Sequence, residues 1–103
     1  MILGKVVGTV WGSKQTPALA GRRVVEVRPL TLAGWVPGQS IRADPEEARL
    51  ADTSMLAVDP LGADVGQLVL VAVGSRSRDI VLACDVPTKH TVVAIVDEAR
   101  VEA

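Results

Sequence analysis

Short valine-rich runs separated by glycine and proline are the feature that most limits what this chain can fold into. Five runs have the length and the β-branched content of strands, and they span residues 2–11, 22–30, 55–59, 67–74 and 90–97. In the second run, Val25 and Val27 alternate with Glu26 and Arg28, which indicates one apolar and one polar face. Five or six short strands in 103 residues predict an all-β fold, a small barrel or sandwich.

Two further segments have alternative interpretations. Residues 78–83 are either one more short strand or part of a loop. Residues 43–52 are either a short helix or an acidic surface loop. The helix would begin with Asp44 as its cap, Pro45 in the first helical position and Glu47 three residues after the cap.

The apolar content of the chain is high for its size. At 103 residues the chain forms one domain, 1–103, yet 49% of its residues are hydrophobic. A small domain has a large surface relative to its volume, so part of the apolar surface needs a partner to cover it. We therefore predict an oligomer in which that surface lies between subunits.

A membrane or secreted location does not fit the sequence. The longest uninterrupted apolar run, Leu68–Val73, is far shorter than the roughly 20 residues of a spanning helix. Lys5 interrupts the first apolar stretch, so we expect no signal peptide. The single cysteine, Cys84, cannot form an internal disulfide, which fits a reducing compartment. We expect a cytoplasmic protein with no membrane partner.

The glycine-rich stretch "DPLGADVGQLVLVAVGSRSR" (59–78) resembles a phosphate-binding loop only superficially. A Walker loop needs a lysine directly after its second glycine, and a helix must follow. Here Gly62 and Gly66 have the wrong spacing, Gln67 stands where lysine is needed, and a valine-rich strand follows. We expect no phosphate site in this stretch.

Catalysis, metal binding and cofactor binding also have little support. Cys84 and His90 could in principle form a nucleophile and its base, which keeps a small redox or hydrolytic enzyme as a third hypothesis. Packing residues of a barrel are the simpler interpretation of both. A metal site needs three or four matched ligands, and we expect no catalytic residue, no metal and no cofactor.

Nucleic-acid binding is the alternative function, because small five-stranded barrels often bind single strands. Such binding needs aromatic platforms and a basic groove. The chain has no Phe or Tyr and only two tryptophans, Trp11 and Trp35, and 11 basic residues face 12 acidic ones. A monomeric OB-type nucleic-acid-binding module therefore stays the second interpretation, and we expect no nucleic-acid partner.

The order of motifs along the chain is similar to that of one known family. The segments are "LGKVVGTVW", "LAGRRVVEVRPL", "VDPLGADVGQLVLVAVGSRSR" and "PTKHTVVAIVD". The third is the most specific, because it resembles the pattern Asp-x-x-Gly-Ala-Gly-x-Gly-Glu, an apolar strand, then Gly-Ser-x-x-Arg. The chain thereby resembles the EutN/CcmL family, also called BMC-P, the vertex proteins of bacterial microcompartments.

The resemblance implies a fold, an assembly and a location. The fold would be a small five-stranded OB-like β-barrel, and five copies would form a homopentamer. The pentamers would cap the fivefold vertices of a shell whose facets consist of hexameric proteins of another fold. The protein would be structural, without catalytic residues or cofactor, and would lie in a carboxysome-like or catabolic compartment in the cytoplasm.

The resemblance also points to candidate site residues. The candidates for pore or subunit-contact loops are Gly62, Ala63, Asp64, Gly66, Gly74 and Ser75. Arg76 and Arg78 are candidates for salt bridges between subunits or with hexamers; solvated surface arginines are the alternative. Asp64 replaces the usual glycine of the pattern, and Gln67 replaces the usual glutamate. In a pentamer, five Asp64 side chains that faced the axis would form an acidic ring. Ordinary barrel corners, without a role at the axis, are the alternative for the glycines.

Overall fold

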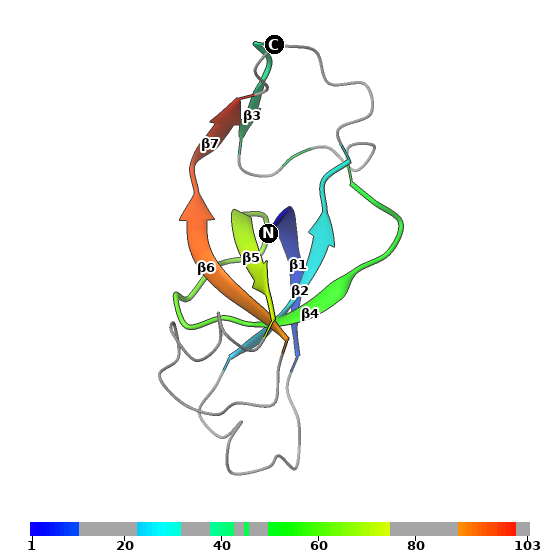
Figure 1. The fold of residues 1–103 in the computed structure, drawn as a ribbon, viewed down its shortest axis with the longest axis vertical. Helices are drawn as coiled ribbons and strands as arrows, with labels where there is room; N and C mark the ends of the chain where they lie inside the picture. Colours follow the sequence, from blue (N-terminus) through cyan, green and yellow to red (C-terminus); the bar gives the residue numbers. More distant parts are fainter. Residues whose placement is uncertain (11–22, 32–37, 43–44, 46–49, 75–88, 101–103) are drawn as a thin grey trace.

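The computed structural model describes residues 1–10, 23–31, 38–42, 45, 50–74 and 89–100. They form an all-β structure with a barrel and a separate two-stranded ribbon (Figure 1). The strands are β1 (Ile2–Val10), β2 (Val24–Pro29), β3 (Ser40–Arg42), β4 (Met55–Val58), β5 (Leu68–Val73), β6 (His90–Val96) and β7 (Glu98–Arg100).

Five strands close into a barrel in the order β1-β2-β4-β6-β5, with β5 pairing back onto β1. Every pair is antiparallel except β4–β6, which meet in parallel where Val58 lies beside Thr91. These five strands are the five that the sequence predicts, with ends that differ by one or two residues. The all-β, five-stranded barrel prediction is confirmed.

The barrel core consists mainly of valines. Its fully buried members come from all five strands and from the β4–β5 loop: Val6, Val25, Val27, Ala57, Ala63, Val69, Val71 and Val92. Gly4 of β1 lies against β2, where an added Cβ would be 2.5 Å from Val27 Cγ1 and 2.9 Å from the Arg28 carbonyl oxygen. Glycine at this position lets two barrel strands approach closely enough for Val27 to fill the interior.

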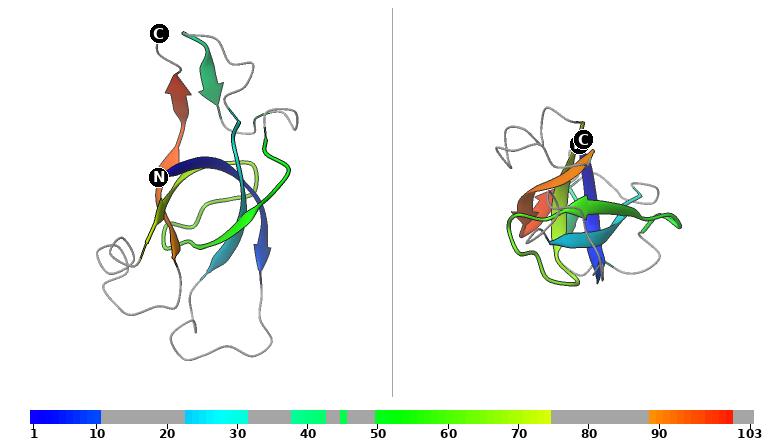
Figure 2. Two further views of the ribbon diagram at one scale, coloured as in Figure 1. Left: turned by 45° about the vertical axis from the view of Figure 1, so that its right-hand side comes forward. Right: turned by 90° about the horizontal axis from the view of Figure 1, so that it is seen from below.

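Strands β3 and β7 form a ribbon that the sequence did not predict. They pair antiparallel, with Ile41 opposite Ala99, and lie beyond one end of the barrel (Figures 1 and 2). Strand β7 follows β6 after a single residue, Asp97, so the chain continues as a strand beyond the predicted strand at 90–97. Pairing with β3 outweighs the weak β propensity of the sequence "EAR".

Two open predictions lie wholly or largely outside the described residues. The possible strand at 78–83 is among them, and of the possible helix at 43–52 only Pro45 and residues 50–52 are described. Leu50 forms an isolated antiparallel bridge with Leu30. The described residues contain no helix, and so no helix that could cross a membrane.

Candidate functional site

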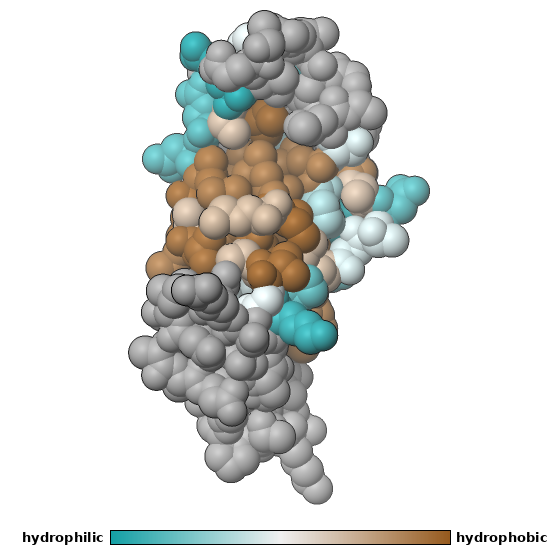
Figure 3. All heavy atoms as spheres, in the orientation of Figure 1, coloured by the Kyte–Doolittle hydropathy of each residue, from teal (hydrophilic) through white to brown (hydrophobic). Residues whose placement is uncertain are grey.

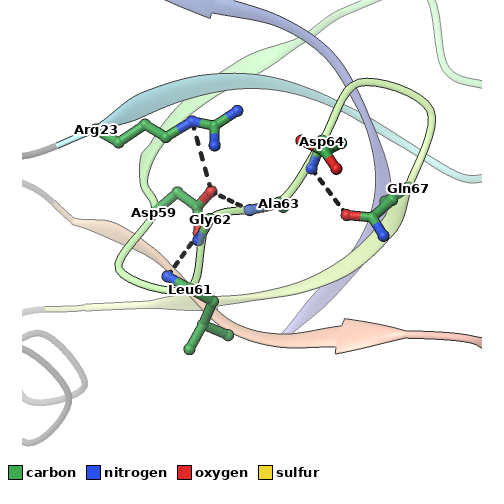
Figure 4. Close-up of polar contacts among 7 residues, drawn as sticks. All are labelled: Arg23, Asp59, Leu61, Gly62, Ala63, Asp64 and Gln67. Carbon is green, nitrogen blue, oxygen red and sulfur yellow. Dashed lines mark hydrogen bonds and ion pairs between the residues drawn. The ribbon is translucent and has the colours of Figure 1, made fainter.

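The β4–β5 loop, residues 59–67, is organised by one buried carboxylate (Figure 4). Asp59 follows β4 directly, and its side chain is completely buried. Its Oδ1 accepts the backbone N–H groups of Leu61 at 2.9 Å and Gly62 at 3.1 Å, and its Oδ2 accepts that of Ala63 at 2.7 Å. An aspartate that accepts N–H bonds from the residues just after it folds the chain into a tight turn.

Arg23, directly before β2, lies against the same carboxylate. Its Nε is 3.9 Å from Asp59 Oδ2, and its backbone carbonyl accepts the Asp59 N–H at 2.8 Å. The arginine side chain is 31% exposed, so water screens part of the attraction. A buried carboxylate with three N–H donors and a nearby guanidinium has its charge well compensated.

The loop is anchored to the barrel at two further points. Ala63 is fully buried and belongs to the hydrophobic core. The Gly66 N–H donates to the Val6 carbonyl at 2.8 Å, and the Gln67 carbonyl accepts the Val6 N–H at 3.0 Å. These contacts continue the pairing of β1 with β5 into the loop, so its second half is held like an additional piece of strand.

Asp64 and Gln67 close a second turn at the far end of the loop from Asp59 (Figure 4). The Asp64 N–H donates to Gln67 Oε1 at 2.8 Å, and the Gln67 N–H donates to the Asp64 carbonyl at 3.1 Å. Gln67 and Asp64, the two residues of this loop that depart from the family pattern, are therefore hydrogen-bonded to each other. A glutamate here would place a second carboxylate on this turn.

The two glycines of the loop have conformations that side chains rarely adopt. Gly62 has φ of 79° and Gly66 has φ of 97°. An added Cβ on Gly62 would meet nothing within 4 Å, so backbone conformation rather than space requires glycine there. Asp64 itself is exposed, as a pore-lining or surface position requires.

The second predicted corner, at Gly74, lies at the other end of β5. Gly74 has φ of 114°, and its N–H donates to the Lys89 carbonyl at 2.7 Å, which joins the end of β5 to the start of β6. The six residues of β5 place it about 20 Å from the β4–β5 loop. Within one chain the two glycine corners therefore form two separate sites.

Several candidates lie outside the described residues: Ser75, Arg76, Arg78 and Cys84. His90 is described and begins β6, where it is half-buried. Among described side chains, no group of three or more His, Cys, Asp or Glu residues could hold a metal ion. Within the loop, the polar groups hydrogen-bond to one another, and these bonds fix the conformation of the backbone.

Sequence reasoning did not assign a role to the residues that hold the loop, namely Asp59, Arg23 and Gln67. A signal for Asp59 was present, because aspartate followed within four residues by glycine is typical of a side chain that caps its own turn. Arg23 carried no such signal, since its proximity depends on the pairing of β2 with β4.

Comparison with known proteins gives a consistent result over nearly the whole chain. The profile of the family "Ethanolamine utilisation protein EutN/carboxysome" matches residues 1–97. The bacterial microcompartment shell vertex protein PduN of Salmonella typhimurium is 32% identical over 97 residues, which cover 94% of this chain and 96% of PduN. The relatives found are shell proteins, so the comparisons do not support the nucleic-acid-binding alternative.

Solved structures show the same fold. The pentameric microcompartment shell protein GrpN of Rhodospirillum rubrum superposes with a TM-score of 0.71 at 29% identity, covering 100% of this chain and 99% of GrpN. CcmL of Gloeobacter violaceus superposes with a TM-score of 0.73 at 24% identity, covering 93% and 84% respectively, and supports the fold alone. With its barrel, its Asp59-centred loop and a family match over residues 1–97, this chain belongs to the EutN/CcmL family.

Proposed function

We propose that this chain is a structural shell protein whose homopentamers cap the fivefold vertices of a bacterial microcompartment in the cytoplasm. The observation that carries the proposal is the likeness over nearly the full chain to a shell vertex protein at 32% identity and to a pentameric shell protein at 29%. Hexameric shell proteins that tile the facets are its partners, and its role is to close corners that hexamers alone leave open.

The geometry of the β4–β5 loop supports this role. A vertex protein needs loops of fixed shape at its contacts, and here Asp59 holds three successive backbone N–H groups while Ala63 enters the core. We propose that Gly62, Ala63, Asp64 and Gly66 shape a loop that lines the fivefold axis or contacts the neighbouring subunit. Gly74 would shape a second contact at the other end of β5. Ser75, Arg76 and Arg78 lie outside the described residues, and we propose Ser75 for the same contact and the two arginines for salt bridges between subunits or with hexamers.

The role can be tested by shell assembly. The chain would be co-produced with hexameric facet proteins, and the purified particles examined by electron microscopy with and without it. We expect closed polyhedra that contain the chain, and open or elongated assemblies when it is omitted. The proposal would be contradicted if both preparations gave equal numbers of closed particles and the chain were absent from those particles.

The proposed acidic ring has its own test. If five Asp64 side chains surround the axis, Asp64→Asn removes five negative charges from one opening while leaving the loop hydrogen bond, which uses the Asp64 backbone N–H. Compared with unmutated shells, closed shells of the variant should take up charged small molecules at a different rate, and the difference should grow with the charge of the molecule. Unchanged uptake of anions and cations alike would place Asp64 away from the pore.

A further inference from the structure

The five strand pairs that close the barrel differ in length. Four are antiparallel and join four to six residues of each strand. The fifth, between β4 and β6, is a single parallel pair, Val58 beside Thr91, and we call this pair the β4–β6 seam. Parallel pairing is also slightly less stable per residue than antiparallel pairing. Figure 1 shows β4 and β6 meeting near the seam and diverging from it, so the barrel is closed most weakly at this point.

A β-bulge in β6 gives a physical reason for the short seam. Leu70 of β5 pairs with Ala94 of β6. The next residue of β5, Val71, pairs with Val92, which leaves Val93 as an extra residue in β6. A bulge bends the strand that carries it and increases its local twist. This bend lies two residues after the seam and accounts for the divergence of β6 from β4.

Contacts elsewhere hold each side of the seam separately. On one side, the Asp59 N–H donates to the Arg23 carbonyl at 2.8 Å and joins the end of β4 to β2. On the other side, β5 and β6 share six residue pairs, and their side chains are part of one continuous apolar surface (Figure 3). These contacts do not cross the seam. If the seam opened, the strands would form one sheet in the order β4-β2-β1-β5-β6, with every antiparallel pair of the barrel kept.

Thr91, the β6 residue of the seam, buries a hydroxyl group at this weakest point of the barrel. The residue is completely buried, and its Oγ1 has no hydrogen-bond partner among the groups that the structure describes. Its neighbours in register, Val58 and Ala72, are apolar and buried as well. A buried hydroxyl without a partner destabilises the state that buries it, because its bonds to water are lost. The closed seam therefore carries a cost that is removed when water reaches Thr91.

We propose that the β4–β6 seam is a conformational device: it opens reversibly while the four antiparallel pairs of the barrel stay intact. Two opposing effects set its equilibrium. Burial of core residues beside the seam, such as Val92, favours the closed barrel, and hydration of the Thr91 hydroxyl favours the open sheet. The inference concerns the single chain and does not depend on the proposed homopentamer.

Opening at the seam also affects the β3–β7 ribbon. Strand β7 follows β6 after one residue, Asp97, and pairs with β3. When β6 separates from β4, the ribbon should move with β6, whereas the β4–β5 loop stays with β1 and β2 through its contacts with Val6 and Arg23. The loop and the ribbon therefore belong to opposite sides of the seam.

Replacing the hydroxyl tests its part in the device. Thr91→Val keeps a β-branched side chain of the same shape and removes its polar atom. Backbone hydrogen exchange followed by NMR reports how often a site is open. At Val58 and Val92 we expect Thr91→Val to slow exchange at least about fivefold, since the closed seam no longer buries an unpaired hydroxyl.

Two control variants separate the hydroxyl from the substitution itself. Thr9→Val makes the same change at an exposed position of β1, and it should leave exchange at Val58 and Val92 as it is in the unmutated protein. Thr91→Ser keeps the hydroxyl at the seam, and it should not slow exchange there. All variants are compared at one protein concentration, because assembly adds to stability.

A second measurement needs no variant and tests whether the opening is local. In low concentrations of urea, exchange through a local opening rises little, because little surface is exposed, whereas exchange through global unfolding rises steeply. In the unmutated protein, Val58 and Val92 should show the shallow dependence, and Val27, buried in the β1–β2 pair, the steep one. An equally steep dependence at all three positions, or exchange that Thr91→Val leaves unchanged or accelerates, would overturn the proposal. Neither result bears on the pentamer, which native mass spectrometry tests separately.

Discussion

The β4–β5 loop and the β3–β7 ribbon both lie outside the strands of the barrel, yet they are held in different ways. The loop has a fully buried carboxylate with three N–H donors, a core alanine and two backbone bonds to Val6. The ribbon consists of two three-residue strands with one buried side chain, Ile41, among its described residues, and the side-chain bond from Ser40 Oγ to Glu98 Oε1 at 2.7 Å is exposed. The loop is thus held by contacts with the barrel core, whereas the ribbon is held mainly by the pairing of its own two strands.

A two-stranded ribbon is marginally stable by itself, whereas a loop tied into a core unfolds only with the core. The loop therefore behaves as a part of the barrel, and we expect the ribbon to open more easily. For a protein that must meet neighbours at fixed angles, a loop of constant shape suits a permanent contact. The following predictions test this contrast, and each compares variants at one protein concentration because assembly adds to stability.

Removing the buried carboxylate should have the largest effect. Asp59→Ala leaves the N–H groups of Leu61, Gly62 and Ala63 without their acceptor, and we expect the free energy of unfolding to fall by about 3 kcal/mol or more. Asp59→Asn, which keeps one oxygen acceptor, should lose less. Urea denaturation followed by circular dichroism measures both. A loss under about 1 kcal/mol for Asp59→Ala would mean that the loop is not tied to the core.

Two glycines allow a matched comparison of the regions. Gly62 in the loop and Gly38 before β3 have φ of 79° and 85°, and an added Cβ would meet nothing within 4 Å at either. Gly62→Ala should cost about 1–2 kcal/mol of unfolding free energy, the strain of a left-handed alanine. Gly38→Ala should cost less, because the ribbon can relax its strain by opening locally. Equal losses would show that the two regions are equally ordered.

Gln67→Ala addresses the second turn of the loop. It removes the Oε1 that accepts the Asp64 N–H, and because this bond is exposed, water can replace it. We expect a loss of about 0.5–1 kcal/mol in the same denaturation experiment. Gln67→Glu serves as its control, since it keeps the acceptor and adds the charge that the family pattern has here. A loss of unfolding free energy as large as that of Asp59→Ala would show that Gln67 holds the loop as strongly as Asp59 does.

Ser40→Ala should have the smallest effect. It removes the exposed bond to Glu98 and should change the free energy of unfolding by less than about 0.5 kcal/mol. Hydrogen exchange offers the more sensitive measurement, since the backbone N–H of Ala63 should exchange much more slowly than the N–H groups of Ser40 and Arg100. Similar exchange rates at these three positions would remove the contrast between loop and ribbon.

The barrel could be predicted because its signals are local. Four of the five strands are valine-rich runs and the other, β4, is the apolar run MLAV; all are bounded by glycine, proline or polar residues, and such runs predict strands directly. The ribbon could not, because Ser40–Arg42 and Glu98–Arg100 become strands only by pairing with each other across 55 intervening residues. Short polar segments of this kind have no strand signal until the rest of the fold brings them together.

The candidate site was predictable in part. The glycines marked the turns on either side of β5, and the structure gives Gly62, Gly66 and Gly74 the positive φ angles that only glycine adopts easily. The role of these turns at a pore or subunit contact stays a prediction. The predicted strand at 67–74 also put Gly66 and Gly74 at its two ends, as β5 confirms. The sequence did not reveal that Arg23 lies against Asp59, because that contact depends on which strands are neighbours, and barrel order cannot be read from periodicity.

Native mass spectrometry of the unmutated chain, at several concentrations, tests the central claim most directly. The account predicts a dominant species at five times the monomer mass of 10.8 kDa. Its share should fall only at high dilution, because the high apolar content of the chain, 49% of its residues, predicts extensive apolar contact between subunits. A monomer at every concentration, or a ring of another order, would contradict the vertex role.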